Sequence, residues 1–201
     1  MTTSQPETRT SEARQRLLAT ATRIFYAEGI HAVGVDRLVA EAKVTRATFY
    51  RHFPSKEDLV VGYLREVHAM ERGAVDAAIA ANPSPADALL AIADWISQAI
   101  QSPGFRGCAF LNAAAEYPAG QPAHDEVIAH RQWFLETLTT LMAQVHARTA
   151  EPAARHFVML RDGAMAAGCL FDPVLVSETF HQGIEGLLRV NAERQANETA
   201  R

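Results

Sequence analysis

The sequence has few of the features that mark secreted or membrane proteins. Only two cysteines, Cys108 and Cys169, occur among its 201 residues, which argues against a disulfide framework. No apolar run approaches the ~20 residues that a membrane-spanning helix needs, and nothing near the amino terminus resembles a signal peptide. We therefore expect a cytoplasmic protein with no membrane partner, and we expect both thiols to be reduced, buried and structural.

Strand patterns and catalytic motifs are also missing. No stretch of four or more residues alternates convincingly between apolar and polar side chains, so we predict an all-α fold. No nucleophile, phosphate or cofactor motif supports an enzyme, and no cofactor is expected. The histidines, His124 and His130 among them, lack the spacing of persuasive metal ligands, so no metal site is predicted. A metal- or redox-sensing helical regulator stays open as the alternative interpretation.

Positive charge is scarce overall but concentrated near the amino terminus. The formal net charge is −4, yet residues 14–65 carry nine Lys or Arg against five Asp or Glu, while the remaining residues carry ten against eighteen. A polyanion would therefore meet the amino-terminal part and be repelled by the rest. This distribution argues against a helical interaction protein that never binds DNA.

Residues 33–59 contain two short helical patterns separated by a turn. The first is predicted by apolar side chains at i, i+3, i+4 and i+7, which are Val35, Leu38, Val39 and Ala42. Thr45 is a typical helix cap, so a second helix should begin near Arg46. Its expected core positions are Ala47, Phe49, Tyr50 and Phe53. Its outward positions, which could reach a groove, are then Arg46, Thr48, Arg51 and His52.

The second helix should end at Pro54, and a third should begin directly after it. Ser55-Lys56-Glu57-Asp58 has the form of a capping box, in which two side chains at a helix start satisfy free backbone amides. Two short helices and a capped third helix in this order are typical of a DNA-reading module.

This segment resembles the helix-turn-helix of the TetR family of transcriptional regulators. The matching residues are Ala42-Lys43-Val44-Thr45, Thr48-Phe49-Tyr50, Phe53, Ser55-Lys56 and Leu59, with Leu17, Leu18, Ala21, Phe25 and Gly29 upstream. Lys43 stands where the family usually has glycine, in a turn that commonly needs a positive φ, at a cost on the order of 1 kcal/mol. Gly34 replaces the usual Ser or Thr cap, which should weaken that cap by a few tenths of a kcal/mol.

The resemblance implies about nine helices, which is also the number read from helical patterns punctuated by Pro and Gly. After the helix-turn-helix, helices are predicted over residues 55–81, 85–102, 105–116, 122–148, 151–171 and 174–194. We expect a flexible arm (residues 1–10), a helix-turn-helix DNA-binding domain (11–54) and a helical effector-binding and dimerisation domain (55–201).

The function implied by the resemblance is that of a ligand-responsive, sequence-specific DNA-binding regulator rather than an enzyme. We expect a repressor that leaves a palindromic, double-stranded operator when a small apolar or amphipathic effector binds. Arg46 and Thr48 are the best candidates for base contacts, and Tyr50 and Lys56 for phosphate contacts. The complete set of expected DNA-binding residues is Arg37, Lys43, Thr45, Arg46, Thr48, Tyr50, Arg51, His52 and Lys56.

Homodimerisation and effector binding are expected of the carboxyl-terminal helices. The expected dimer residues form a stripe of small and bulky side chains: Phe157, Leu160, Ala164, Ala167, Phe180, Ile184 and Leu187. The alternative, that this stripe packs within one protomer, stays open. The expected ligand residues, for whose aromatic members core packing is the alternative, are Trp95, Phe110, Asn112, Glu116, His130, Trp133 and Met142. The effector itself is not identified by these residues.

Overall fold

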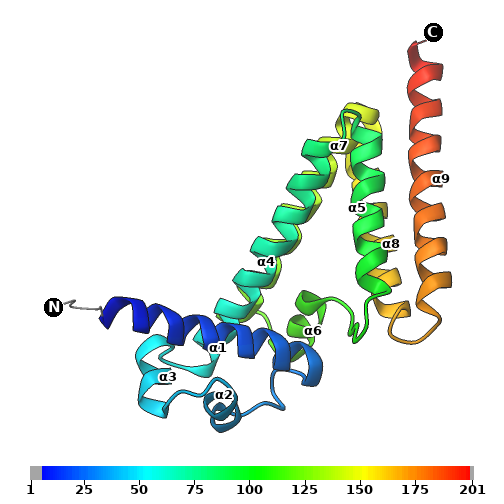
Figure 1. Ribbon diagram of the computed structural model, residues 1–201. Helices are drawn as coiled ribbons and strands as arrows, with labels where there is room; N and C mark the ends of the chain where they lie inside the picture. Colours follow the sequence, from blue (N-terminus) through cyan, green and yellow to red (C-terminus); the bar gives the residue numbers. More distant parts are fainter. Residues whose placement is uncertain (1–5, 200–201) are drawn as a thin grey trace. The chain divides into compact units, whose positions relative to one another are not determined.

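The computed structural model describes residues 6–199, and over this range the all-α prediction is confirmed. A short 3-10 helix spans Ala147–Thr149. The α-helices, drawn in Figure 1, are α1 (Pro6–Glu28), α2 (Val35–Glu41), α3 (Arg46–His52), α4 (Lys56–Ala81), α5 (Pro85–Ile100), α6 (Ala109–Glu116), α7 (Pro122–Val145), α8 (Ala150–Ala167) and α9 (Pro173–Thr199). In this part of the chain, no helix has the length and hydropathy required to span a membrane.

The helix ends follow local signals in the sequence. Thr45 caps α3, since its Oγ1 accepts a hydrogen bond from the backbone N–H of Thr48 at 3.1 Å. Ser55 and Asp58 form the predicted capping box: the Ser55 amide donates to Asp58 Oδ2 at 2.8 Å, and the Asp58 amide donates to Ser55 Oγ at 3.0 Å. Gly34 caps α2 without any side-chain hydrogen bond, as its lack of a side chain requires.

The chain divides into two compact units whose limits differ from the expected domain boundary. Unit 1 consists of residues 1–68 and 109–127, and unit 2 of residues 69–108 and 128–201. The start of α4 and all of α6 thus belong with the helix-turn-helix, because long-range hydrogen bonds described below attach them to it. Helix α1 already begins at Pro6, so residues 6–10 are helical and not part of an arm. Residues 1–5 lie outside the described residues.

The core of unit 1 fixes the orientation of α3. Phe49 is fully buried and Phe53 is 3% exposed, one helical turn apart. A Cβ added to Gly62 of α4 would come within 2.9 Å of a Leu18 methyl and 3.3 Å of the Phe53 ring, so a larger residue there would force one of these side chains to move. Ala47 and Tyr50, which were predicted to face the core, are exposed, because this seven-residue helix buries only its Phe49 side among its neighbours, which include α1 and α2.

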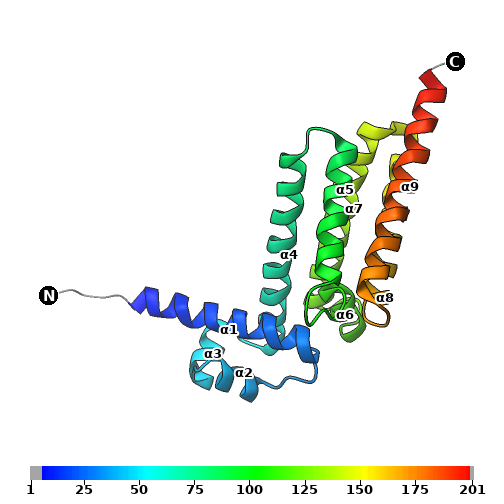
Figure 2. The same cartoon turned by 45° about the vertical axis from the view of Figure 1, so that its right-hand side comes forward.

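Unit 2 is a helical bundle in which α5, α8 and α9 lie side by side (Figures 1 and 2). Aromatic rings join its helices: Phe157 of α8 meets Phe134 of α7 at 6.3 Å and Phe180 of α9 at 6.0 Å between ring centroids, both edge to face. Gly168, after α8, allows close approach, since a Cβ there would lie 2.7 Å from Ile100. The bundle core is therefore continuous from α5 through α7, α8 and α9.

The expectation of two buried thiols is wrong for one of them. Cys108 is buried, whereas Cys169 is exposed. The reason is that α8 ends at Ala167, so that Cys169 lies in the connection to α9 and not on a packed helical face.

Lys43 has the only positive φ, +53°, among the described non-glycine residues, as expected of its turn. Replacing Lys43 with glycine should leave the thermal midpoint of unfolding unchanged or raise it. The relief of left-handed strain, about 1 kcal/mol, offsets the greater entropy of the unfolded glycine chain. Ala40→Gly is the matched control, since Ala40 is exposed in α2 and should lose about 1 kcal/mol of helix stability. A fall in the midpoint of Lys43→Gly as large as that of the control would contradict the strain.

Candidate nucleic-acid interface

Helix α3 presents a solvent-facing ridge on unit 1. With Phe49 anchored in the core, Ala47, Tyr50 and Arg51 are exposed, and Tyr50 keeps 48% of its surface in solvent. Thr48 is half-buried, and its hydroxyl lies 2.9 Å from that of Thr45. The ridge therefore offers a phenol and a guanidinium, both able to hydrogen-bond with a polyanion.

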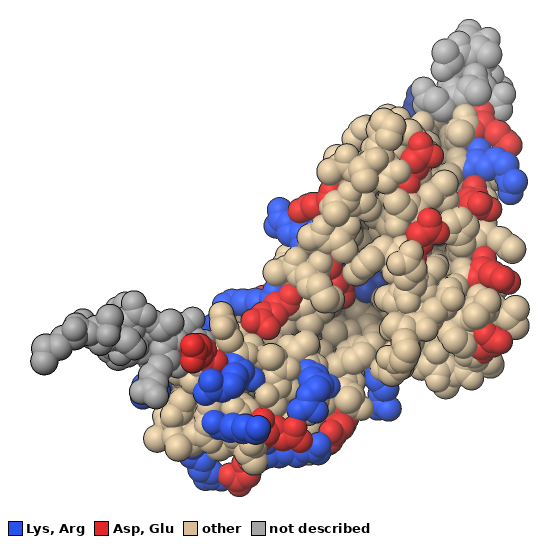
Figure 3. All heavy atoms as spheres, viewed as in Figure 1, with Lys and Arg blue, Asp and Glu red and all other residues tan. Residues whose placement is uncertain are grey.

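Basic side chains gather around this ridge, with acidic side chains between them. Figure 3 shows Lys and Arg over the elements of unit 1. Arg46 donates from Nε to Asp36 at 2.6 Å, and this hydrogen bond, with the charge of Asp36, raises the pKa of Arg46. Arg37 similarly donates from Nη2 to Glu28 at 2.7 Å. Such exposed pairs contribute little to stability, so a phosphate or a base edge can replace the carboxylate as the partner of either arginine.

Lys43 and Arg51 differ from these paired arginines. Both side chains are exposed, and no ion pair to either is seen among the side chains that the structure describes. The left-handed turn places Lys43 directly before α3, and Arg51 lies in the last turn of that helix. These two cations are accordingly available without breaking an existing pair.

Lys56 lies differently from the expected phosphate contact. Its Nζ donates to the backbone oxygen of Ile30 at 2.6 Å and lies 5.9 Å from the centre of the Phe25 ring. Burial lowers the pKa of Lys56, although the nearby Glu116 carboxylate partly opposes this effect. Its ammonium group is therefore committed to holding the turn after α1.

His52 is half-buried at the end of α3. Its Nε2 is buried and has no hydrogen-bond partner among the described residues. Burial, with the charges of Arg51 and Arg14, lowers the pKa of His52, so the ring is neutral near pH 7. A neutral, partly buried imidazole supplies packing and no charge for phosphate.

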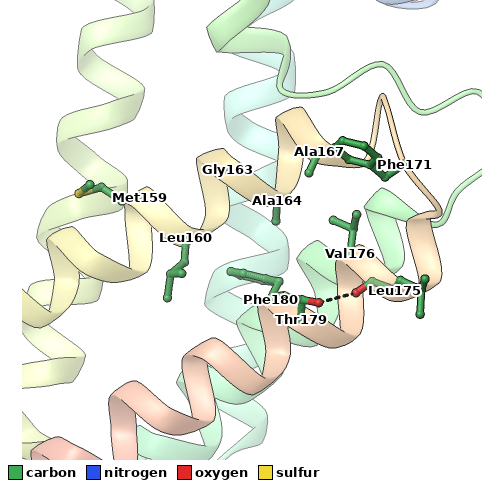
Figure 4. Close-up of a pocket in the computed structure, with 10 residues that line it drawn as sticks. All are labelled: Met159, Leu160, Gly163, Ala164, Ala167, Phe171, Leu175, Val176, Thr179 and Phe180. Carbon is green, nitrogen blue, oxygen red and sulfur yellow. Dashed lines mark hydrogen bonds between the residues drawn. The ribbon is translucent and has the colours of Figure 1, made fainter.

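The expected dimer stripe is only partly exposed. Phe157 and Ile184 are fully buried inside the protomer, and Leu187 is half-buried. The other four line an apolar groove of about 360 Å³ between α8 and α9 (Figure 4). The residues lining this α8–α9 groove are Met159, Leu160, Gly163, Ala164, Ala167, Phe171, Leu175, Val176, Thr179 and Phe180.

Large apolar side chains at the rim of the α8–α9 groove are unusually exposed. Met159 and Phe171 are each 69% exposed, and Leu175 is 61% exposed. Met159 and Phe171 are absent from the predicted dimer residues. The signal that could have found them is their position next to small residues, since Gly163 and Ala167 let a facing helix approach closely.

The expected ligand residues divide between the two units. Phe110, Asn112 and Glu116 lie on α6 in unit 1, where Phe110 is fully buried and Asn112 is exposed. Trp95, His130, Trp133 and Met142 lie in unit 2. Of these, Met142 and His130 are almost fully buried, and Trp95 and Trp133 are half-buried.

Unit 2 also contains a buried ionic cluster that was not predicted. Arg161 of α8 is 2% exposed; its Nη1 lies 3.0 Å from Asp162 and donates to Cys108 Sγ at 3.2 Å. Glu71 of α4 lies 3.9 Å from Arg161 and 3.4 Å from His130, and burial raises the pKa of Glu71. The sequence did hold a signal, because Arg161 lies four residues after the core residue Phe157 and hence on the buried face of α8. Among the described residues, no three His, Cys, Asp or Glu side chains are arranged to hold a metal ion.

Comparison with known proteins places the helix-turn-helix in a defined class. Residues 17–62 match the family model described as bacterial regulatory proteins, tetR family. A solved TetR-family transcriptional regulator from Streptomyces coelicolor is 60% identical, with 90% of this chain and 97% of that chain covered and a TM-score of 0.88.

Curated relatives match over shorter stretches. The transcriptional regulator LmrA of Bacillus subtilis is 26% identical over 43% of this chain, and EthR of Mycolicibacterium smegmatis is 29% identical over 67%. These matches span 46% and 56% of the relatives' own lengths. The chain thus covers about half the length of these curated relatives.

Proposed function

The chain belongs to the TetR family of transcriptional regulators, and from this premise we propose that it is a ligand-responsive repressor that binds a palindromic operator. The observation that carries the proposal is the exposed ridge of α3, anchored by Phe49, capped by Thr45 and surrounded by Arg37, Lys43 and Arg46. The family and its relatives are regulators of transcription and not enzymes.

Recognition proceeds through the α3 ridge and its neighbours. Arg46 exchanges Asp36 for a base edge or phosphate, with Thr48 beside it, because an arginine can pair bidentately with guanine. Lys43 and Arg51 contribute phosphate contacts that fix the register of the helix. Tyr50 donates its phenolic hydrogen to phosphate, while Lys56 and His52 support the module from within.

A second copy of the chain occupies the α8–α9 groove. Two observations support this interface. Apolar side chains such as Phe171 and Leu175 are exposed at the groove, and its small central residues, Gly163, Ala164 and Ala167, allow a second helix to approach closely. A twofold dimer formed this way presents two copies of α3 about one turn of DNA apart, roughly 34 to 36 Å, which requires an approximately palindromic site.

Effector binding lowers the affinity for DNA by a shift in population. Helix α4 is continuous from Lys56 in unit 1 to Ala81 in unit 2, so a ligand that favours one position of α4 also selects the position of the DNA-reading helices. The effector is a small apolar or amphipathic molecule, a class supported by the aromatic side chains of unit 2.

Selection of bound fragments from genomic DNA, followed by fluorescence anisotropy on the recovered sequences, tests this function. We expect salt-dependent binding to an inverted repeat with two protomers bound per site. Recovery of no preferred sequence, or binding of equal strength to any duplex, would refute a sequence-specific regulator.

Arg46→Ala should weaken binding to the selected operator by about 1–3 kcal/mol and relax the sequence preference at one position of each half-site. The matched control is Arg72→Ala, which removes an exposed arginine paired with Asp76 on α4. Anisotropy titrations of both variants decide the matter. If Arg46→Ala binds as tightly as the control, the ridge is presented in another orientation.

Lys56→Met should lower the thermal midpoint but leave the salt dependence of DNA binding unchanged. Its ammonium donates to Ile30, and loss of that hydrogen bond costs about 1 kcal/mol of stability. Arg51→Ala should do the reverse, reducing the slope of log affinity against log salt by about 1 and leaving the midpoint in place. A reduced salt slope in Lys56→Met would show that this side chain leaves Ile30 to bind phosphate.

Leu175→Glu should convert the dimer into a monomer, because a carboxylate would be buried without a partner in the apolar interface. Met70→Glu is the control, since Met70 is equally exposed, at 63%, but lies on α4 and not in the α8–α9 groove. Sedimentation equilibrium at micromolar concentration gives the masses. A monomeric wild-type protein, or a dimeric Leu175→Glu variant, would exclude the groove as the interface.

A further inference from the structure

Glu116, the last residue of α6, forms hydrogen bonds with the turn between α1 and α2. The Glu116 carboxylate accepts hydrogen bonds from the backbone N–H of Ile30 at 2.9 Å, the backbone N–H of His31 at 2.5 Å and His31 Nδ1 at 2.8 Å. Eighty-six residues separate Glu116 from Ile30, so this contact is wholly tertiary. Glu116 is one of the residues expected from the sequence to bind the ligand, and the structure instead shows its carboxylate at this turn.

The turn is shaped to receive an anion. Gly29 has φ +91°, and the two amides that follow it point at one carboxylate, which is the concave arrangement of backbone donors known to bind anions. A Cβ on Gly29 would lie 3.6 Å from Glu116 Oε1 and would be strained by that φ. Burial by itself would raise the pKa of Glu116, but the hydrogen bonds from Ile30 and His31 outweigh it and hold the pKa below its usual value. The carboxylate is thus ionised at neutral pH.

Lys56 and Tyr117 also contact the turn between α1 and α2. Lys56 of α4 donates to the Ile30 oxygen, so the Ile30 residue is held through its N–H by α6 and through its C=O by α4. The His31 ring stacks on Tyr117, the residue after α6, with 5.0 Å between ring centroids and 25° between planes. Two helices therefore meet at one turn, which leads directly into the helix-turn-helix.

The Glu116 contact adds little to the core of unit 1. His31 keeps 62% of its side chain exposed and Glu116 keeps 23%, whereas the core residues Leu17, Leu38 and Phe49 are fully buried. Breaking the contact should leave the three amino-terminal helices folded and release only α6 from them.

Resting on the proposed function, we propose that Glu116 is the positioning residue through which α6 and the DNA-reading helices sense each other's state. The chain enters α6 from Cys108 of unit 2, so a ligand-induced movement in that unit reaches α6 through the backbone. The carboxylate then passes the movement to the turn between α1 and α2. By reciprocity, operator binding at α3 must alter α6 through the same contact.

Hydrogen–deuterium exchange on the full-length protein tests this, with a genomic fragment selected by the wild-type protein as the DNA probe. In Glu116→Gln, the Ile30 and His31 amides should exchange about tenfold faster than in wild type, the effect of weakening one hydrogen bond. Saturating DNA should slow the exchange of α6 amides in wild type and leave it unchanged in Glu116→Gln. The control is Glu126→Gln, which removes the same charge from unit 1 but loses only an exposed pair with Arg65, and it should respond like wild type.

DNA-dependent slowing of α6 exchange in Glu116→Gln equal to that of wild type would overturn the inference while leaving the proposed function intact. Unchanged exchange at Ile30 and His31 would overturn it as well. A wild-type protein that selects no DNA fragment would contradict the proposed function and the inference together. If Glu116→Gln fails to fold, His31→Ala, which removes one of the three hydrogen bonds and the stack on Tyr117, should show a smaller loss of the α6 response; a full wild-type response would overturn the inference.

Discussion

Burial of Phe49 is the constraint on which the DNA-reading surface depends. A seven-residue helix is too short to be stable by itself, so α3 takes its rotation from the one side chain that it buries completely. Phe53, one turn later, packs against Gly62 of α4, where a larger residue would displace the Phe53 ring or Leu18. With these two rings fixed, the exposure of Tyr50 and Arg51 follows from helical geometry alone.

The ion pairs on this surface contribute little to the stability of the fold, and their arginines can exchange a carboxylate partner for DNA. Arg37 and Arg46 are paired with carboxylates in the free protein, yet both guanidinium groups are about half or more exposed. Such pairs are weak in water, so each guanidinium can leave its carboxylate at little cost. A DNA phosphate competes with each carboxylate on nearly equal terms, so net affinity comes from the many contacts made together and is sensitive to salt.

Local signals predicted the helices well, and tertiary contacts account for what was missed. The helix caps formed by Thr45, Ser55 and Asp58 use hydrogen bonds between residues less than four positions apart, so the sequence predicts them. Lys56 lies at the predicted helix start, but its direction is set by Ile30, 26 residues away. The exposure of Tyr50 depended in the same way on which side of α3 meets the core, and no short-range pattern encodes that choice.

The position of α6 shows why a sequence boundary at residue 54 separates parts that the structure keeps together. A boundary drawn from motifs ends where the helix-turn-helix ends, but compactness is decided by hydrogen bonds and buried area. The Glu116 carboxylate accepts a hydrogen bond from the Ile30 N–H, and the Lys56 ammonium donates one to the Ile30 oxygen. Both α6 and α4 therefore act on the DNA-reading helices through the backbone of Ile30. To act as a coupling element, this contact must be formed in one state of the protein and broken in the other.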